Sequence, residues 1–175
     1  MSILLELFDR AVDWEYSDES KTGHIKAEFV LPDADGVEIK YEVDFVEEAN
    51  ETELEELPTP FPPNTGGAWD ISFTSRIWDW TSGTYGRRVV NITGGGNEFI
   101  VLSTIMNIIH KTVDRYSMNN IMFGAAKREQ SRVKLYTRMV QTMRNEWAII
   151  PPAAVTANYS HITSPEHDTW MLVRK

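Results

Sequence analysis

The segment Asn91–Phe99 reads NITGGGNEF and decides how the middle of the chain is interpreted. The run RRVVNI at residues 87–92 leads into the three glycines and predicts a β-strand. From Asn97 to Tyr116, apolar residues recur at intervals of three and four, which predicts a helix. Glycine loses more conformational freedom on folding than other residues, so three in a row indicate a tight turn or a ligand held close to the backbone. Backbone N–H groups at such a helix start suit phosphate or pyrophosphate.

The flanking segments predict further strands and one more helix. An alternation of apolar and polar residues predicts strands at His24–Leu31, Val37–Val46 and Trp69–Ile77, the first two joined by a PDADG turn. Strands are also predicted at Asn119–Ala125, at WAII (residues 147–150) and in the C-terminal DTWMLVRK, and residues 127–146 have helical spacing. Trp78–Gly86 is interpreted as a turn-rich link.

The order of these elements predicts a mixed α/β (α+β) fold. Antiparallel strands come first and a β-α-β crossover follows, with helices on the faces of a mostly antiparallel sheet. The length of 175 residues suits a single domain. Within residues 1–175 we distinguish N-terminal strands (1–46), an acidic, Pro-rich loop (47–68), and the sheet and helices of residues 69–175.

Charge is distributed unevenly along the chain. Residues 1–60 hold 18 Asp and Glu against 4 Lys and Arg, whereas residues 61–175 hold 8 against 13. The acidic half argues against phosphate-backbone binding to nucleic acid. It is typical of a solvated surface, and it also suits a basic protein partner, a homo-oligomer held by charge complementarity, or a nucleic-acid mimic. The chain has no Cys, no secretory leader and no membrane-spanning run, so we expect a cytoplasmic protein.

Two segments resemble the GNAT-type N-acetyltransferase superfamily. Residues 91–96, NITGGG, are similar to the family's cofactor loop, in which Gln or Arg is followed by two residues, Gly, any residue, and Gly or Ala. Here Asn91 takes the first position. SRVKLYTRM at residues 131–139 is similar to the family's later helix, which carries a Leu-Tyr pair. The same segments are similar to GNAT-like proteins that tailed bacteriophages encode.

This resemblance implies acetyl-CoA as cofactor and an amine as acceptor. Tyr136 occupies the position from which the family donates a proton to the departing thiolate, although a Tyr on an apolar helical stripe is equally typical of a core residue. No carboxylate lies on residues 87–92, where such enzymes often place a general base. The resemblance and the phosphate argument together predict the following cofactor-binding residues: Asn91, Thr93, Gly94, Gly95, Gly96, Asn97 and Glu98.

Two functions of different class follow from the sequence. The first is an acetyl-CoA-dependent N-acetyltransferase of phage type, without a metal, acting in the host cytoplasm. The second keeps the fold without the activity, as a virion structural component or a host-interaction protein. The long acidic, Pro-rich segment and the missing base favour the second function, and the glycine run favours the first.

Overall fold

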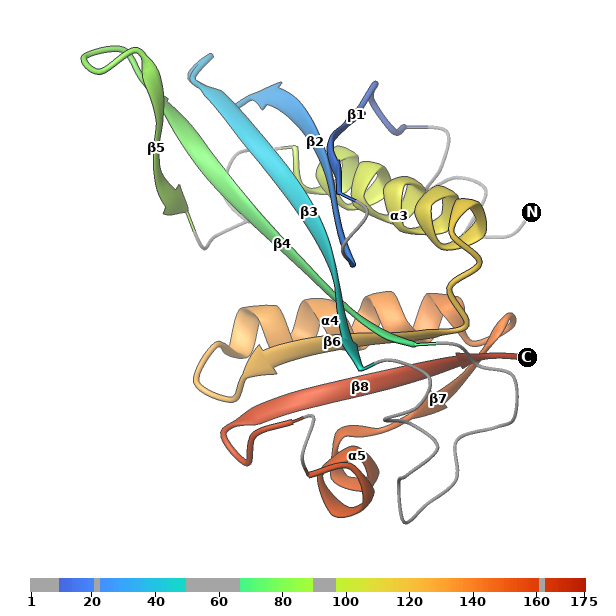
Figure 1. The fold of residues 1–175 in the computed structure, drawn as a ribbon. Helices are drawn as coiled ribbons and strands as arrows, with labels where there is room; N and C mark the ends of the chain where they lie inside the picture. Colours follow the sequence, from blue (N-terminus) through green and yellow to red (C-terminus); the bar gives the residue numbers. More distant parts are fainter. Residues whose placement is uncertain (1–9, 21–22, 50–66, 90–96, 161–162) are drawn as a thin grey trace. The chain divides into compact units, whose positions relative to one another are not determined.

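The computed structural model describes residues 10–20, 23–49, 67–89, 97–160 and 163–175 (Figure 1). Within these residues the fold is mixed α+β, with a mostly antiparallel sheet of eight strands and three helices. The strands lie in the hydrogen-bonded order β1-β2-β3-β4-β6-β8-β7, and β5 pairs with β4. The predicted fold class is therefore confirmed at this level.

The elements lie close to the predicted segments. The strands are β1 Glu15–Ser20, β2 His24–Pro32, β3 Glu38–Ala49, β4 Ala68–Asp79, β5 Thr84–Val89, β6 Asn120–Ala126, β7 Trp147–Ile150 and β8 His167–Arg174. The helices are α3 Glu98–Arg115, α4 Gln130–Met143 and α5 Pro152–Asn158. The loop predicted at residues 47–68 begins later, because β3 continues to Ala49, and residues 50–66 lie outside the described part of the chain. No described helix is both long enough and apolar enough to cross a membrane.

The chain forms two compact units, each described by itself below. The first unit comprises residues 1–44 and 73–112, and the second comprises residues 45–72 and 113–175. Strands β3 and β4 and helix α3 contribute residues to both units.

The first unit contains the predicted turn between β2 and β3. Gly36 has a φ of +78°, a backbone conformation that favours glycine. The Asp33 carboxylate accepts hydrogen bonds from the N–H groups of Asp35 and Val37, at 2.9 and 2.8 Å, and so fixes the turn. This confirms the strand–turn–strand prediction for residues 24–46.

Strand β5 differs from the prediction. A link was expected at Trp78–Gly86 and a strand at Arg87–Ile92, but β5 begins at Thr84 and forms a hairpin with β4, with Asp79 opposite Thr84. The tight turn explains the earlier start: Gly83 has a φ of +64°, and its N–H donates to the carbonyl of Asp79 at 2.8 Å.

The second unit places β6 between β4 and β8. β4 pairs with β6 in parallel, and α3 lies between these strands in the chain, so the predicted β-α-β crossover is present. Helix α4 packs against one face of β6 and β8 through Tyr136, Met139, Val140 and Met143. Helix α5 packs against β8, and Val155 and Tyr159 join a core cluster with Met122, Met171 and Val173.

Helix α5 was not predicted, because the prolines after Ile150 were interpreted only as the end of a strand. Pro152 occupies the first turn of the helix, where its missing N–H has no helical acceptor to lose. A pair of prolines can therefore end one element and begin the next.

Candidate functional site

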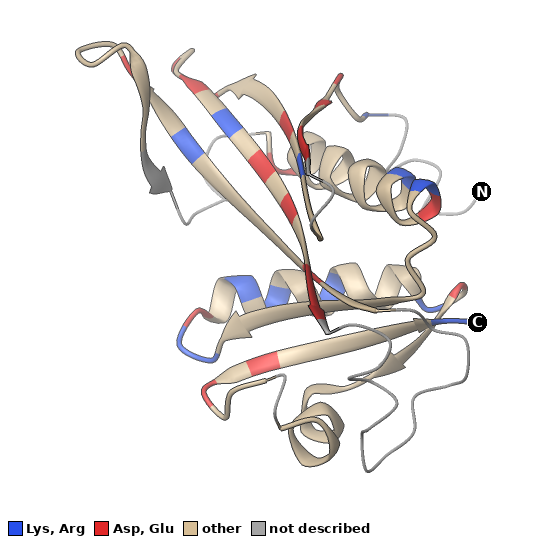
Figure 2. Ribbon diagram, in the orientation of Figure 1, with Lys and Arg blue, Asp and Glu red and all other residues tan. Residues whose placement is uncertain are grey.

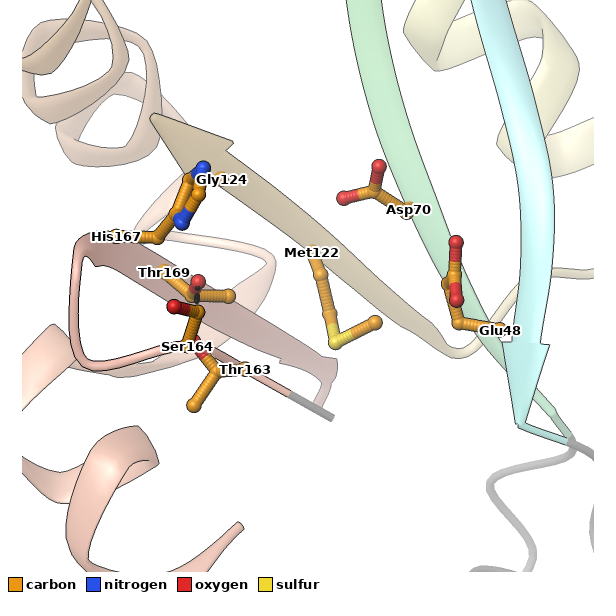
Figure 3. A pocket seen from close by; sticks show the side chains of 8 residues that line it. All are labelled: Glu48, Asp70, Met122, Gly124, Thr163, Ser164, His167 and Thr169. Atoms are coloured by element: carbon orange, nitrogen blue, oxygen red, sulfur yellow. Dashed lines mark hydrogen bonds between the residues drawn. The ribbon is translucent and has the colours of Figure 1, made fainter. Parts of the chain in front are cut away.

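A pocket of about 310 Å³ lies within the second unit. Figure 3 shows Glu48 and Asp70 on one side, Met122 between, and His167 with several hydroxyl-bearing residues on the other side. Glu48 belongs to β3 and Asp70 to β4, while His167 begins β8. The complete lining is Glu48, Asp70, Met122, Gly124, Thr163, Ser164, His167 and Thr169.

The pocket lies where the parallel pairing of β4 and β6 ends. The paired residues run from Ala68 opposite Asn120 to Asp70 opposite Met122. β6 continues to Ala126, and this part is paired with β8. Asp70 thus sits at the end of the parallel ladder, beside a stretch of β6 that β8 covers on its other edge.

Gly124 adds room to the pocket. A Cβ built at this position would meet Thr169 Oγ1 at 3.6 Å, which is ordinary van der Waals contact. The backbone at Gly124 does not have a positive φ. The packing of β6 on β8 therefore does not require glycine, and the absent side chain leaves space beside Met122.

Asp70 has an unusual electrostatic environment for a carboxyl group. Burial, and secondly the nearby negative charge of Glu48, raise the pKa of Asp70 to about 6. Among the described residues, no hydrogen bond or ion pair compensates the Asp70 carboxylate. A carboxyl group with this pKa is mostly ionised at neutral pH and is a stronger base than an ordinary surface carboxylate.

The opposite wall of the pocket carries hydroxyl groups and an imidazole. The hydroxyls of Thr163 and Thr169 share a hydrogen bond of 2.8 Å (Figure 3). Ser164 Oγ accepts from the N–H of Glu166 at 3.3 Å, and the N–H of His167 donates to the carbonyl of Ser164 at 2.9 Å. These bonds fix the segment that precedes β8 and hold its polar side chains along one wall.

Tyr136, the predicted catalytic residue, lies in the core on α4 with an exposed fraction of 1%. Its ring contacts Phe123 and Trp170, at centroid distances of 5.6 and 6.4 Å. Burial raises the pKa of Tyr136; the positive charge of Arg132 opposes this shift, and the negative charges of Asp70 and Glu129 add to it.

Asp70 and Tyr136 belong to opposite faces of the sheet. Side chains alternate along a strand, so Met122 and Phe123 point to opposite faces of β6. Asp70 is opposite Met122 in the register, whereas Tyr136 contacts Phe123. The charge of Asp70 nevertheless reaches the Tyr136 hydroxyl, as its effect on the pKa of Tyr136 shows.

The predicted glycine site is only partly described. Asn91, Thr93, Gly94, Gly95 and Gly96 lie outside the described residues. Asn97 and Glu98 lie at the start of α3 in the first unit, and Tyr136 lies in the second.

The described end of the glycine site shows how α3 begins. The Asn97 carbonyl accepts from the N–H of Val101 at 2.9 Å, which starts the helical hydrogen bonding. The Asn97 side-chain amide donates to the carbonyl of Pro32 at 2.6 Å. Glu98 occupies the first turn of the helix, where a negative charge complements the helix dipole.

Sequence reasoning missed Asp70, Glu48 and His167. A general base was sought on residues 87–92, which hold no carboxylate. Among the described strands, β6 pairs with β4 and β8, so the carboxylate next to β6 comes from β4. The sequence signal that could have identified the base was Asp70, a carboxylate within the alternating segment Trp69–Ile77.

Comparison with known proteins assigns no family to the chain. No protein-family model, no curated protein and no solved structure matches it. Within the described part of the chain, no group of three or more His, Asp or Glu residues has the arrangement of a metal site. The function is therefore argued from the pocket and its surroundings.

Proposed function

We propose that the protein is an N-acyltransferase that transfers the acetyl group of acetyl-CoA to an amine. The observation that carries this proposal is Asp70, a poorly solvated carboxylate with a pKa of about 6, at the end of the β4–β6 pairing and within electrostatic reach of Tyr136. A carboxylate base at the point where two strands stop pairing suits proton removal from an attacking amine.

Asp70 acts as the general base in this proposal. Asp70 takes one proton from the ammonium form of the acceptor, the neutral amine nitrogen then bonds to the thioester carbonyl carbon, and the second proton, which nitrogen loses as the amide forms, goes to the departing sulfur. The carbon–sulfur bond then breaks, and its electron pair leaves with sulfur. A base with a pKa near 6 is ionised at neutral pH and still binds a proton more tightly than an ordinary carboxylate, which is what this step needs.

The resemblance, and not the lining of the pocket, gives Tyr136 a role at the departing sulfur in this proposal. Because burial raises the pKa of the phenol, Tyr136 keeps its proton at neutral pH. A thiol has a pKa of about 8.5, so complete proton transfer from Tyr136 to the thiolate would be uphill. Tyr136 therefore donates a hydrogen bond to the negative sulfur and is not deprotonated.

The sequence supports the part of the proposal that concerns acetyl-CoA binding. Residues 91–96 resemble the GNAT acetyl-CoA loop, and α3 begins two residues after them, at Glu98. Backbone N–H groups of Gly94, Gly95 and Gly96 ahead of a helix start would hold the pyrophosphate.

Calorimetric titration of the protein with acetyl-CoA tests whether the cofactor binds. Gly95→Glu, which adds a bulky negative side chain to the glycine run, should abolish binding. Thr81→Glu adds the same charge at the exposed β4–β5 turn and is the matched control. Micromolar binding to the wild type and the control, lost in Gly95→Glu, supports the proposal. Failure of the wild type to bind at millimolar acetyl-CoA refutes it.

A second candidate is a non-catalytic protein that binds a host or virion protein. The observation that favours it is Trp80, which is 80% exposed at the turn of the β4–β5 hairpin, where Trp78 lies edge-on to both Trp80 and Tyr85. Exposed Trp residues are enriched in protein interfaces. This candidate replaces the acyltransferase if the protein does not bind acetyl-CoA and the wild type and Asp70→Asn show the same rate of acetyl transfer.

A further inference from the structure

We propose that the acceptor is a small hydroxylated amine, of the amino sugar or amino alcohol class. This inference rests on the proposed acyltransferase function, because it names the substrate of the same pocket. Its basis is the difference between the two walls of the pocket: two carboxylates on β3 and β4 face hydroxyl groups and an imidazole at the start of β8 (Figure 3).

The acidic wall suits the ammonium group of an acceptor. Glu48 is exposed and Asp70 is more buried, and the two carboxylates are close enough for Glu48 to raise the pKa of Asp70. A cation between two negative groups would relieve their mutual repulsion. Glu48 would then attract the charged amine, and Asp70 would receive its proton at the reacting position.

The opposite wall suits hydroxyl groups. Thr163 and Thr169 share one hydrogen bond, in which one hydroxyl donates and the other accepts. Each oxygen therefore keeps a lone pair that can accept a hydrogen bond from a ligand. Ser164 and His167 add two more polar side chains to this wall. Small polar groups that each offer a donor or an acceptor recognise a ligand that carries several hydroxyls, whereas a plain alkyl chain would leave them without partners.

The basicity of Asp70 also favours a hydroxylated amine over a lysine side chain. The amine of Lys has a pKa of about 10.4, roughly four units above that of Asp70, so proton transfer to Asp70 would be strongly uphill. Neighbouring oxygen atoms withdraw electrons and lower the pKa of an amine. An amino sugar therefore loses its proton to this base more readily.

The size of the pocket points in the same direction. Its volume of about 310 Å³ is at the small end of the range for ligand pockets, about 300–1,000 Å³. A single sugar ring fits within such a volume. Gly124 contributes part of this space, since its missing side chain would otherwise project beside Thr169.

The test is calorimetric titration with three probes in the absence of acetyl-CoA. Glucosamine carries both an ammonium group and hydroxyls, glucose lacks the ammonium group, and cyclohexylamine lacks the hydroxyls. We expect glucosamine to bind at least about tenfold more tightly than either of the others. Equal or tighter binding of cyclohexylamine, or of a peptide with a free amino terminus or a lysine, would overturn the proposal.

Two matched variants locate the binding. Glu48→Gln should weaken glucosamine binding roughly fivefold and leave glucose binding unchanged, because only glucosamine carries a positive charge. Glu47→Gln removes the same charge at the neighbouring exposed position of β3 and should leave both unchanged. Equal effects of the two substitutions would place the amine elsewhere and refute the assignment.

These titrations also separate the two proposals. Glucosamine binding that depends on Glu48, in a protein that does not bind acetyl-CoA, supports the pocket assignment and refutes the acyltransferase. Acetyl-CoA binding without preference for glucosamine supports the acyltransferase and refutes the acceptor class.

Discussion

The negative charge of Asp70 raises the pKa of Tyr136, although the two side chains belong to opposite faces of the sheet in the second unit. This coupling links the pocket with the helix α4. Burial is the larger cause of the raised pKa of Tyr136, and a neutral residue at position 70 should leave that pKa less raised than in the wild type.

The substitution Asp70→Asn should reduce acetyl transfer by about 10²- to 10⁴-fold, because the amide cannot accept the proton of the amine. The same substitution should stabilise the fold at pH 8 by about 1–3 kcal/mol, since it removes a poorly solvated charge whose pKa folding raises to about 6. Steady-state kinetics and urea unfolding measure the two effects. A destabilised, fully active variant would contradict both expectations.

The pH dependence of the reaction should follow Asp70. Transfer requires the carboxylate form, so kcat/KM should rise with pH through about 6. Stability should change in the opposite direction. The folded state binds the proton more tightly than the unfolded state, so the contribution of this group is fully present below about pH 4 and is lost as pH rises through about 6. Unfolding of wild type and Asp70→Asn between pH 4 and 8 tests the sign.

The substitution Tyr136→Phe separates the two roles that the sequence allows for this residue. Phe retains the ring contacts with Phe123 and Trp170 and removes the hydroxyl. A role at the departing sulfur predicts that kcat falls at least about tenfold while the melting temperature stays within a few degrees. Tyr136→Ala should instead destabilise the protein by about 3–5 kcal/mol through the cavity it creates. Full activity of Tyr136→Phe would leave Tyr136 as a core residue only.

The C-terminus of α3 offers a stability prediction that is independent of function. Ser117 has a φ of +52°, and the bonds from Ser117 N–H to Asp114 and from Met118 N–H to Val113 form a Schellman motif. Glycine adopts this conformation without the Cβ clash. We expect Ser117→Gly to stabilise the protein by about 0.5–1 kcal/mol in urea unfolding. Ser117→Val should destabilise it, and a result of the opposite sign would exclude backbone strain at Ser117.

Much of the secondary structure could be predicted because its patterns are local. The helix expected at Asn97–Tyr116 is α3, Glu98–Arg115, and the strand expected at Asn119–Ala125 is β6, Asn120–Ala126. The alternation at His24–Leu31 gives β2 almost residue for residue. The periodicity of apolar residues indicates which face of a helix or strand is buried, so elements with one buried face are predicted most easily.

The pocket could not be predicted because it depends on pairing between distant strands. Asp70 lines the pocket because the pairing of β4 with β6 ends at Asp70 and Met122. No local pattern indicates that β6 lies beside β4. His167 joins the pocket through the turn before β8, which joins two elements without periodicity of its own.

Both carboxylates of the pocket flank one connecting segment of the chain. Glu48 lies two residues before residues 50–66 and Asp70 lies four residues after them, whereas the hydroxyl wall belongs to the chain around β8. The strand pairing fixes the two carboxylates independently of this segment, since β3 lies beside β4 and Asp70 lies opposite Met122 of β6. Loop-closure entropy grows only slowly with length, so insertions between two paired strands cost little free energy. In evolutionary terms, residues 50–66 could change in length among descendants of this protein while the residues that line the pocket keep their places.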